Sequence, residues 1–409
     1  MLPMFFIFAQ TADEIQYKIT QKNSEIEKLE QEVKSYQAEL STLGAQKNSL
    51  NSSIKGLDLT RKKLNADISI TQNKIDKTNL EIQKLGKEIV SKQGNISENT
   101  NVITQDIKVL NEFENKNIIE LLFMGQDLGA IWNDVDNMAT LRENIRKAIV
   151  ELKNKKVSLE SDRDETIQAK NELTKLKITL ADQKKIVEQN VAEKNRLLKQ
   201  TKNSEANYQK ILKINLAKIE IFEKELRDYE SQLKFILDPK SLPESHVLSW
   251  PIESPFVTQL FGKTSASKRL YASGSHSGVD FRASVGTPVL AMADGIIKGT
   301  GDTDTSCAGA SFGKWVYIEH NNGLGSTYGH LSLIKATVGQ VVRRGEIIAY
   351  SGATGHVTGP HLHVTVYASK AVEIKSLPSK SCPGKSLYQP FAAVNAYLDP
   401  MIYLPVYKQ

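Results

Sequence analysis

A seven-residue repeat runs through the N-terminal half of the chain and constrains its fold more than any other feature. From Ile19 to Leu110, every seventh position is apolar at twelve of fourteen places, Lys47 and Arg61 being the exceptions. A second seam, rich in leucine, follows three residues after the first. Mostly β-branched residues in one seam and leucine in the other are typical of a coiled coil. We predict one helix of about a hundred residues, roughly 150 Å long.

A second helical pattern follows over about 138–237. It keeps one seven-residue register until Lys194 and Thr201 interrupt it, so we expect its C-terminal part to change register. Two long helices with matching seams most simply form an antiparallel hairpin, which we place at 13–237. Pairing between two chains, giving a homodimer, is the competing arrangement. The coil alone fits a spacer or oligomerisation rod as well as a regulatory arm.

The segment 117–141 between these helices is far more apolar than its flanks and contains Trp132. One interpretation is a buried tip that caps the hairpin. The other is a docking surface for a membrane or for a cell-division partner, because apolar side chains at the end of a rod favour contact with another molecule.

The first nine residues, MLPMFFIFA, form a short apolar run that polar residues follow. We interpret 1–12 as the remnant of a signal peptide, which would place the protein outside the cytoplasm. No basic residue precedes the run, so an apolar stub is the alternative.

Charge and hydropathy exclude some classes of protein. The net charge is only +6, which does not indicate a dedicated nucleic-acid binder. No run approaches the ~18 apolar residues of a spanning helix, so a polytopic membrane protein is excluded. Residues 239–409 carry 15 basic and 10 acidic side chains, a surplus of +5 that suits an anionic partner.

A change in residue composition and hydrophobic pattern marks a second domain. Four prolines punctuate the segment 238–255, which we interpret as a linker. In 256–409, short β-rich runs alternate with glycine turns, the pattern of a mainly antiparallel β domain. The predicted fold class is therefore α+β multidomain, a long coiled-coil hairpin followed by a compact antiparallel β domain.

Histidines gather in this second domain. Six of the seven in the chain fall within 276–363. His276 and Asp280 form an H-x-x-x-D pair, and His361 and His363 form an H-x-H pair whose members point to the same face of a strand. Imidazole and carboxylate donors suit Zn²⁺, and three protein ligands leave a fourth position open for water. Either pair alone is uninformative, whereas together they indicate a catalytic metal site.

Three motifs extend this pattern to a known family. The segments HSGVDFRASVGTPVLAMADG (276–295), STYGHLS (326–332) and TGPHLHV (358–364) resemble the lysostaphin/LytM-type zinc peptidases, which hydrolyse peptidoglycan. The resemblance covers about 250–368. It implies a compact antiparallel β core, one zinc ion and cleavage of amide bonds in cell-wall stem peptides or cross-bridges.

The resemblance also assigns roles to five residues. It implies His276, Asp280 and His363 as the zinc ligands. His330 and His361 correspond to the two catalytic histidines that do not bind the metal. One of them would take a proton from water and the other would steady the developing oxyanion, and the sequence leaves open which does which.

The coil in front of such a domain is similar to that of EnvC/PcsB-type cell-division hydrolases and activators. This looser similarity implies peptidoglycan as a partner, an FtsEX-like membrane complex that binds the coil, and no nucleic acid. It also implies that the coil restrains the hydrolase part. The alternative function is a non-catalytic activator of other wall hydrolases, although such activators have usually lost zinc ligands.

Several features depart from the family pattern. Thr365 stands where a glutamate often follows the H-x-H pair, so the contacts that orient a ligand are expected to differ. An insert near 301–313 contains Cys307, and a tail over 369–399 contains Cys382. In an exported protein the two cysteines would form one disulfide, and two free thiols are the alternative.

Three further histidines receive structural interpretations. We place His320 in a hairpin turn and His356 in a solvated glycine loop near the cleft. His246, in the linker, has no assigned role.

Overall fold

The computed structural model describes most of the chain. Its described residues exclude 1–11, 45–48, 115–127, 234, 236, 239–241, 264–274, 358, 380–381 and 408–409. Nearly all of the expected signal-peptide remnant therefore lies outside the described residues. The chain divides into two compact units, Met1–Leu29 with Ser69–Leu180, and Glu30–Ile68 with Ala181–Gln409.

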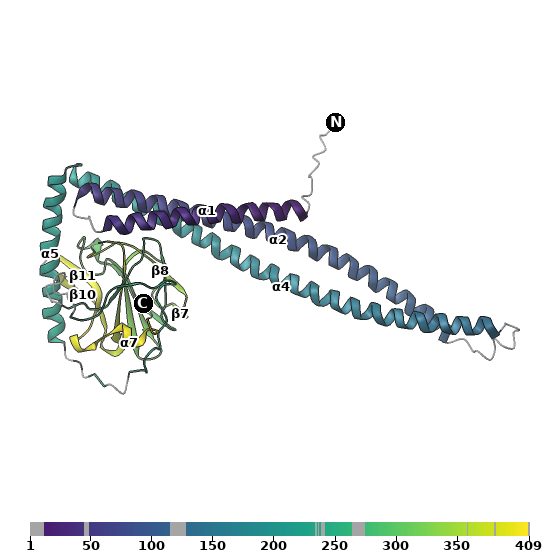
Figure 1. Ribbon diagram of the computed structural model, residues 1–409. Helices are drawn as coiled ribbons and strands as arrows, with labels where there is room; N and C mark the ends of the chain where they lie inside the picture. Colours follow the sequence, from purple (N-terminus) through teal and green to yellow (C-terminus); the bar gives the residue numbers. More distant parts are fainter. Residues whose placement is uncertain are drawn as a thin grey trace. The chain divides into compact units, whose positions relative to one another are not determined.

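Long helices precede an antiparallel sheet, as the sequence predicted. The helices are α1 (Ala12–Gly44), α2 (Leu50–Glu114), α4 (Leu128–Thr201) and α5 (Glu205–Gln232). In the first unit α1 lies along α2, where Lys22 Nζ donates to Asn73 Oδ1 at 3.0 Å (Figure 1). The α2–α4 pair of the predicted hairpin is joined there by Lys92 Nζ and Asp162 Oδ2, 2.7 Å apart.

The prediction of one unbroken helix over 19–110 was wrong. The helix ends at Gly44 and a new one begins at Leu50, with the Ser49 hydroxyl accepting from the Ser52 N–H at 3.1 Å as a cap. In the sequence, Lys47 is one of the two polar residues of the apolar seam, and it falls between these two helices. The chain instead folds back and adds a third helix to the hairpin.

The second predicted helix also breaks, close to the expected change of register. Lys202 and Asn203 adopt left-handed backbone angles, with φ of +50° and +55°. A right-handed helix cannot continue through two such residues. The pattern interruption at Thr201 therefore marks the end of α4 rather than a shift within it.

Residues 117–127 of the apolar segment 117–141 fall outside the described residues, so its two interpretations both stand. The described part begins α4 at Leu128. Trp132 on this first stretch is 70% exposed.

The C-terminal domain is built on a strongly connected antiparallel sheet (Figure 1). Its central order is β1-β2-β9-β6-β5-β4-β7, with β12 on β9 and with β8 joining β3 to β6. A separate hairpin, β10–β11, follows. The strands are β1 (Val257–Gln259), β2 (Val279–Phe281), β3 (Pro288–Leu290), β4 (Gly295–Asp302), β5 (Lys314–His320), β6 (Leu324–Ile334), β7 (Val341–Val342), β8 (Ile347–Ser351), β9 (Leu362–Ala368), β10 (Glu373–Ser379), β11 (Lys385–Phe391) and β12 (Tyr397–Leu398). Short helices are η2 (Thr303–Thr305), η3 (Ser369–Ala371), η4 (Val394–Ala396) and α7 (Pro400–Tyr403).

Both faces of the central strands are buried, each against a different cluster. On β9, Val364 and Val366 join the main hydrophobic core, while the alternate residue Tyr367 packs with Trp315 and Tyr317 of β5 in a second cluster. The tail hairpin covers this second face, where the Trp315 Nε1–H donates to the Tyr388 carbonyl at 3.1 Å. His363 and Thr365 share the face of Tyr367, because side chains two residues apart point the same way.

The expected disulfide is confirmed, because Cys307 of the insert is bonded to Cys382 of the tail. The bond ties the insert that follows β4 to the turn of the β10–β11 hairpin. These two segments are 75 residues apart in the sequence.

Part of the expected linker 238–255 belongs to the folded domain. Leu248 and Ile252 are 1% and 2% exposed and lie in the main core. The Leu248 N–H donates to the Tyr403 carbonyl at 2.8 Å. The prolines correctly indicate irregular backbone in this stretch, but its apolar side chains are part of the main hydrophobic core.

Within the second unit, helix residues pack on the β domain. Leu64 of α2 and Ile186 of α4 form a buried cluster with Leu333 and Tyr350. Asp182 of α4 accepts from Lys335 Nζ at 2.6 Å and from Tyr350 Oη at 3.1 Å.

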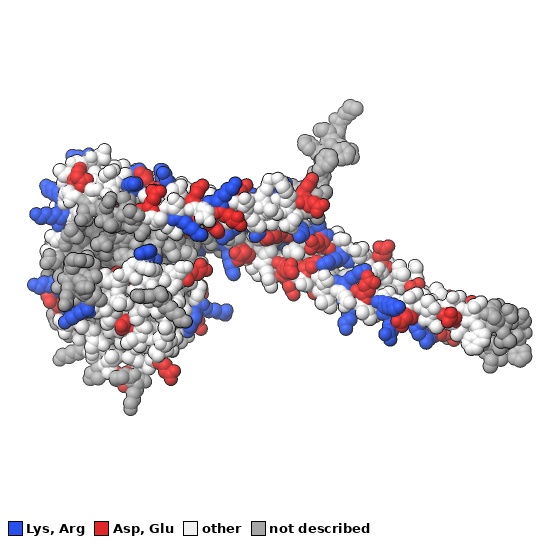
Figure 2. Space-filling model, viewed as in Figure 1, with Lys and Arg blue, Asp and Glu red and all other residues white. Residues whose placement is uncertain are grey.

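Acidic and basic side chains are interspersed along the helices (Figure 2). No helix within the described ranges is long and apolar enough to cross a membrane.

Candidate metal centre and active site

Two adjacent strands bring the predicted metal-binding residues together. β2 and β9 are antiparallel neighbours, and their register sets Asp280 directly opposite His363. His276 precedes β2 and is held by a two-way backbone bridge to Gly262. His361 precedes β9 and bridges to Gly352. The H-x-x-x-D and H-x-H spacings therefore converge because the two strands that carry them are paired.

Three of these side chains place one donor atom each around a common point. Asp280 Oδ1 lies 2.8 Å from His363 Nδ1 and 3.3 Å from His276 Nε2, and the two nitrogens are 3.1 Å apart. All three residues are buried, with 2–6% exposure. Donors at 2.0–2.1 Å from a tetrahedral ion would be about 3.3 Å from one another, so these atoms have the spacing of a metal site.

His276 and His363 each have their second ring nitrogen in contact with another group. His276 Nδ1 lies 3.1 Å from the Leu260 carbonyl, and His363 Nε2 lies 2.9 Å from Thr365 Oγ1. A donor N–H on that far nitrogen leaves the near nitrogen unprotonated, as a metal ligand must be. Thr365, the departure from the family pattern, thus takes the place of the partner that orients His363.

The two predicted catalytic histidines lie beside the donor cluster. The ring centroids of His330 and His361 are 4.7 Å apart, and His361 Nε2 is 3.7 Å from Asp280 Oδ1. His330 Nδ1 donates to the Thr354 carbonyl at 2.9 Å, and His361 Nδ1 donates to the Gly359 carbonyl at 2.8 Å. In this protonation pattern both rings keep Nε2 free to accept a proton.

Burial and charge shape the protonation of the cluster. Burial lowers the pKa of His330 well below its usual value, and the nearby His361 and His363 lower it further. Burial also lowers the pKa of His363. For Asp280, burial raises the pKa of the carboxyl, but the contacts with His276 and His363 and the nearby His361 lower it by more, so it lies well below its usual value. The directions for His363 and Asp280 favour an unprotonated imidazole and an ionised carboxylate, the forms that bind a divalent cation.

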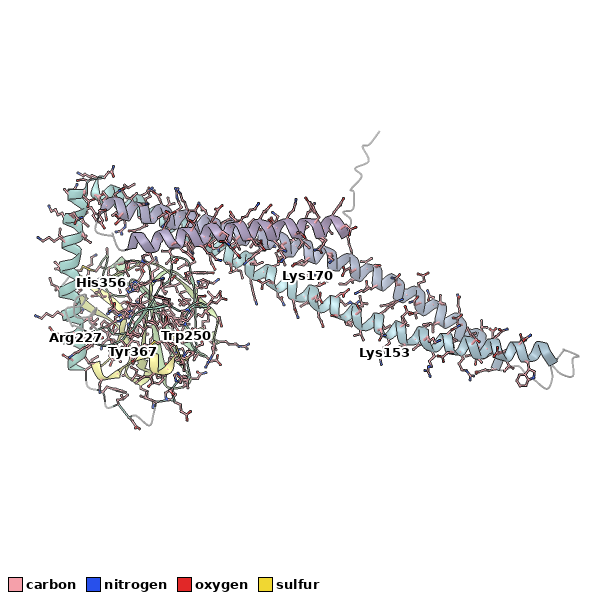
Figure 3. All side chains as sticks on the ribbon, viewed as in Figure 1. Lys153, Lys170, Arg227, Trp250, His356 and Tyr367 are labelled. Atoms are coloured by element: carbon pink, nitrogen blue, oxygen red, sulfur yellow. A yellow bond between two sulfur atoms is a disulfide. The ribbon has the colours of Figure 1, made fainter. Side chains whose placement is uncertain are left out.

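The structure thus brings all five predicted residues into one site, and the other three histidines make different contacts. His320 is the last residue of β5 rather than a turn residue. It is buried, and its Nε2 lies 2.8 Å from Ser326 Oγ, so it serves packing. His356 lies in the C-terminal domain, where Figure 3 labels it, and its N–H donates to the Ser311 carbonyl at 2.8 Å. His246 Nδ1 contacts the carbonyl of Leu404, near the C-terminus of the chain, at 2.6 Å.

Sequence reasoning missed the main-chain carbonyl groups that orient the rings. Leu260, Thr354 and Gly359 contribute only their carbonyl oxygens. A carbonyl is common to every residue, so no side-chain pattern could have indicated these three.

Comparison with known proteins agrees with this geometry. Residues 274–374 match the model of peptidase family M23, a range that includes all five site residues. This part of the chain is an M23 peptidase domain. The resemblance drawn from the three motifs is confirmed.

Two relatives show the extent of the similarity. The M23 domain is 44% identical over 88 residues to the DD-carboxypeptidase/endopeptidase Mpg of Neisseria meningitidis, covering 22% of this chain and 19% of that protein. It is 37% identical over 131 residues to the peptidoglycan DD-endopeptidase ShyA of Vibrio cholerae, covering 31% of this chain and 29% of that protein. The matches therefore span less than a third of the relatives' length.

Solved structures with similar segments include two peptidases. A zinc-containing peptidase from Vibrio cholerae is 28% identical, with a TM-score of 0.28, and covers 39% of this chain and 41% of that chain. The catalytic domain of lysostaphin from Staphylococcus simulans is 27% identical, with a TM-score of 0.26, and covers 36% and 90%. The TM-scores are low, and the fold described above rests on this chain's own strand pairing.

Proposed function

We propose that this protein is a zinc-dependent endopeptidase that hydrolyses amide bonds in the stem peptides or cross-bridges of peptidoglycan. The observation that carries the proposal is the convergence of His276, Asp280 and His363 on one point, with two further imidazoles beside it. The similarity to ShyA, a peptidoglycan DD-endopeptidase, supports a peptidoglycan substrate. Because that substrate lies outside the cytoplasm, we place the protein there too.

The donor set fits zinc. Two imidazole nitrogens and one carboxylate oxygen are typical zinc ligands, and three protein ligands leave a position for water or substrate. Sulfur donors play no part, since Cys307 and Cys382 are bonded to each other. When bound, zinc would lower the pKa of water and polarise the scissile carbonyl.

The chain's own residues would supply the proton transfers. His361 and His330 each present Nε2 with Nδ1 fixed by a carbonyl, so either ring can accept a proton from an attacking water. Once protonated, the same nitrogen can donate to the oxyanion or to the leaving amine. His361 is 18% exposed at its side chain and is the more accessible to substrate, which favours it as the first proton acceptor.

Digestion of purified peptidoglycan by the full-length protein tests this proposal. New amine and carboxyl ends should appear by mass spectrometry, and a chelator or His363→Ala should abolish them. His246→Asn is the matched control, because it removes a histidine away from the site and asparagine tolerates the left-handed backbone, φ +59°, at that position. A zinc-loaded protein that releases no ends would instead support the alternative, an activator of other hydrolases.

We also propose that the coil restrains the site, in cell division or wall remodelling, and that a membrane complex of the FtsEX kind releases it. The support is the packing of helix residues on the M23 domain. A Cβ on Gly286, six residues after Asp280, would meet Leu64 Cδ2 of α2 at 2.8 Å. Asp182 of α4 binds Tyr350, which lies two residues before the Gly352 bridge to His361.

A further inference from the structure

His330 is held in an unusual backbone conformation by groups outside its own strand. Its φ is +61°, a left-handed value that a non-glycine residue rarely adopts. Its N–H donates to the Phe312 carbonyl at 2.7 Å, and its Nδ1 donates to the Thr354 carbonyl at 2.9 Å. The orientation of this imidazole therefore depends on two segments, the end of the 301–313 insert and the loop 352–356.

These two segments interlock through their backbones. A Cβ on Gly313 would lie 2.3 Å from Gly355 N, and one on Gly355 would lie 2.2 Å from Gly313 N. The His356 N–H donates to the Ser311 carbonyl at 2.8 Å. Two glycine backbones in direct contact leave no room for a side chain, so a small shift of either segment moves the other.

One carboxylate joins the segments at this contact. Asp304 Oδ2 accepts from the Gly355 N–H at 2.8 Å, and its Oδ1 accepts from the Gly309 N–H at 2.6 Å. Gly355 directly follows Thr354, whose carbonyl holds the His330 ring. The same insert is bonded to the tail through Cys307, three residues after Asp304. Asp304 thus connects an anchored insert to the residue that orients His330.

We propose that Asp304 is a positioning residue for His330. It fixes the 352–356 loop so that the Thr354 carbonyl keeps Nδ1 of His330 protonated and its Nε2 directed at the reacting atoms. The inference rests on the proposed function for its effect on catalysis, but the hydrogen bond that it predicts exists with or without hydrolysis.

Two readouts on the full-length, zinc-loaded protein test this inference. The first is the His330 Nδ1–H signal in NMR spectra of protein labelled with ¹⁵N-histidine, assigned by its absence in His330→Gln. The second is the steady-state hydrolysis of a soluble peptidoglycan peptide. In Asp304→Ala the signal should be lost to exchange with water, and kcat should fall roughly ten- to hundredfold with KM and zinc content unchanged.

Asp302→Ala is the matched control. Asp302 lies on the same insert, and its Oδ1 accepts from the Asp304 N–H at 3.1 Å as a helix cap. Removing it weakens the insert without removing either contact of the Asp304 carboxylate. This variant should keep the His330 signal. Its kcat should stay within about threefold of the original, because losing a helix cap affects mainly stability.

Asp304→Asn guards against misfolding of the alanine variant, because it retains one acceptor oxygen and should give an intermediate effect. A protected His330 signal and an unchanged kcat in a folded Asp304→Ala would overturn the inference. An equal loss in Asp302→Ala would overturn it too. If no variant hydrolyses peptide but the NMR signal behaves as expected, the proposed function fails while the positioning role stands.

Discussion

Replacing Gly278 with alanine should separate the two strands that carry the metal ligands. A Cβ at this position would lie 2.2 Å from the Val364 carbonyl oxygen and 2.9 Å from His363 Nε2. Real Cβ contacts below 3.0 Å essentially never occur, so the backbone before β2 must move at least about 0.8 Å from β9. The obstacle is backbone rather than the end of a flexible side chain, and rotamer changes cannot relieve it.

This displacement exceeds what a metal site tolerates. Ligand distances must lie within about 0.2 Å of their preferred values. Asp280 and His276 flank Gly278, whereas His363 lies on the opposite strand. We therefore expect zinc affinity to fall at least roughly tenfold, and the added methyl to destabilise the domain by about 1–3 kcal/mol.

Competition with a chromophoric chelator measures the affinity, and thermal unfolding of the metal-free protein measures the stability. Gly299→Ala is the matched control in β4, where a Cβ would meet the flexible end of Ile374 at 2.6 Å and the Trp315 ring at 3.1 Å. It should cost stability and leave zinc affinity unchanged. A folded Gly278→Ala that binds zinc as tightly as the original would refute the account of how β2 and β9 build the site.

Three further predictions concern the rest of the molecule. Burial raises the pKa of Glu230 to about 7 from 4.5. Between pH 4.5 and about pH 7, the Glu230 carboxyl is therefore protonated in the folded chain and ionised in the unfolded chain. The free energy of unfolding should therefore fall by about 3 kcal/mol as pH rises from about 4.5 through 7, and urea titrations should lose this component in Glu230→Gln. Breaking the bond between Cys307 and Cys382 by Cys382→Ser frees a 75-residue loop and should cost about 4 kcal/mol by the loop-entropy relation; an unchanged unfolding midpoint would contradict this. Asp182→Ala removes the α4 contact with Tyr350 and, if the coil restrains the site, should raise the hydrolysis rate at constant zinc content, whereas an unchanged or lower rate would count against restraint.

The donor cluster could be predicted because its geometry follows from local rules. Side chains alternate along a strand, which puts His361 and His363 on one face. The short H-x-x-x-D spacing allows His276 to lie just before a strand and Asp280 to lie on it. The pairing of β2 with β9 was not readable from the spacing. The resemblance supplied the ligand set alone, and the pairing is given by the register of Asp280 and His363 in the structure.

The helical breaks and the ring-orienting carbonyls were beyond the sequence for a different reason. A heptad seam reports which face of a helix is buried, so the leucine seam keeps its spacing from Leu43 to Leu50 although α1 ends at Gly44 and α2 begins at Leu50. The left-handed angles of Lys202 and His330 likewise leave no trace in residue type. In each case tertiary contacts decide a backbone conformation that local propensity does not favour.

The hydrogen bonds of Asp304 illustrate the same limit at the site. The backbone N–H groups that donate to it lie 5 and 51 residues away, on Gly309 and Gly355. An aspartate in a polar insert reads as a turn residue, and only the folded loop shows that it lies next to the support of His330.

The most direct test of the central claim is an anomalous difference map, recorded at the zinc absorption edge, from crystals of the full-length protein loaded with zinc. The account predicts one peak about 2.0–2.2 Å from His276 Nε2, His363 Nδ1 and an Asp280 carboxylate oxygen. A peak bound by other residues, or no peak among these three in a protein shown to contain zinc, would contradict it.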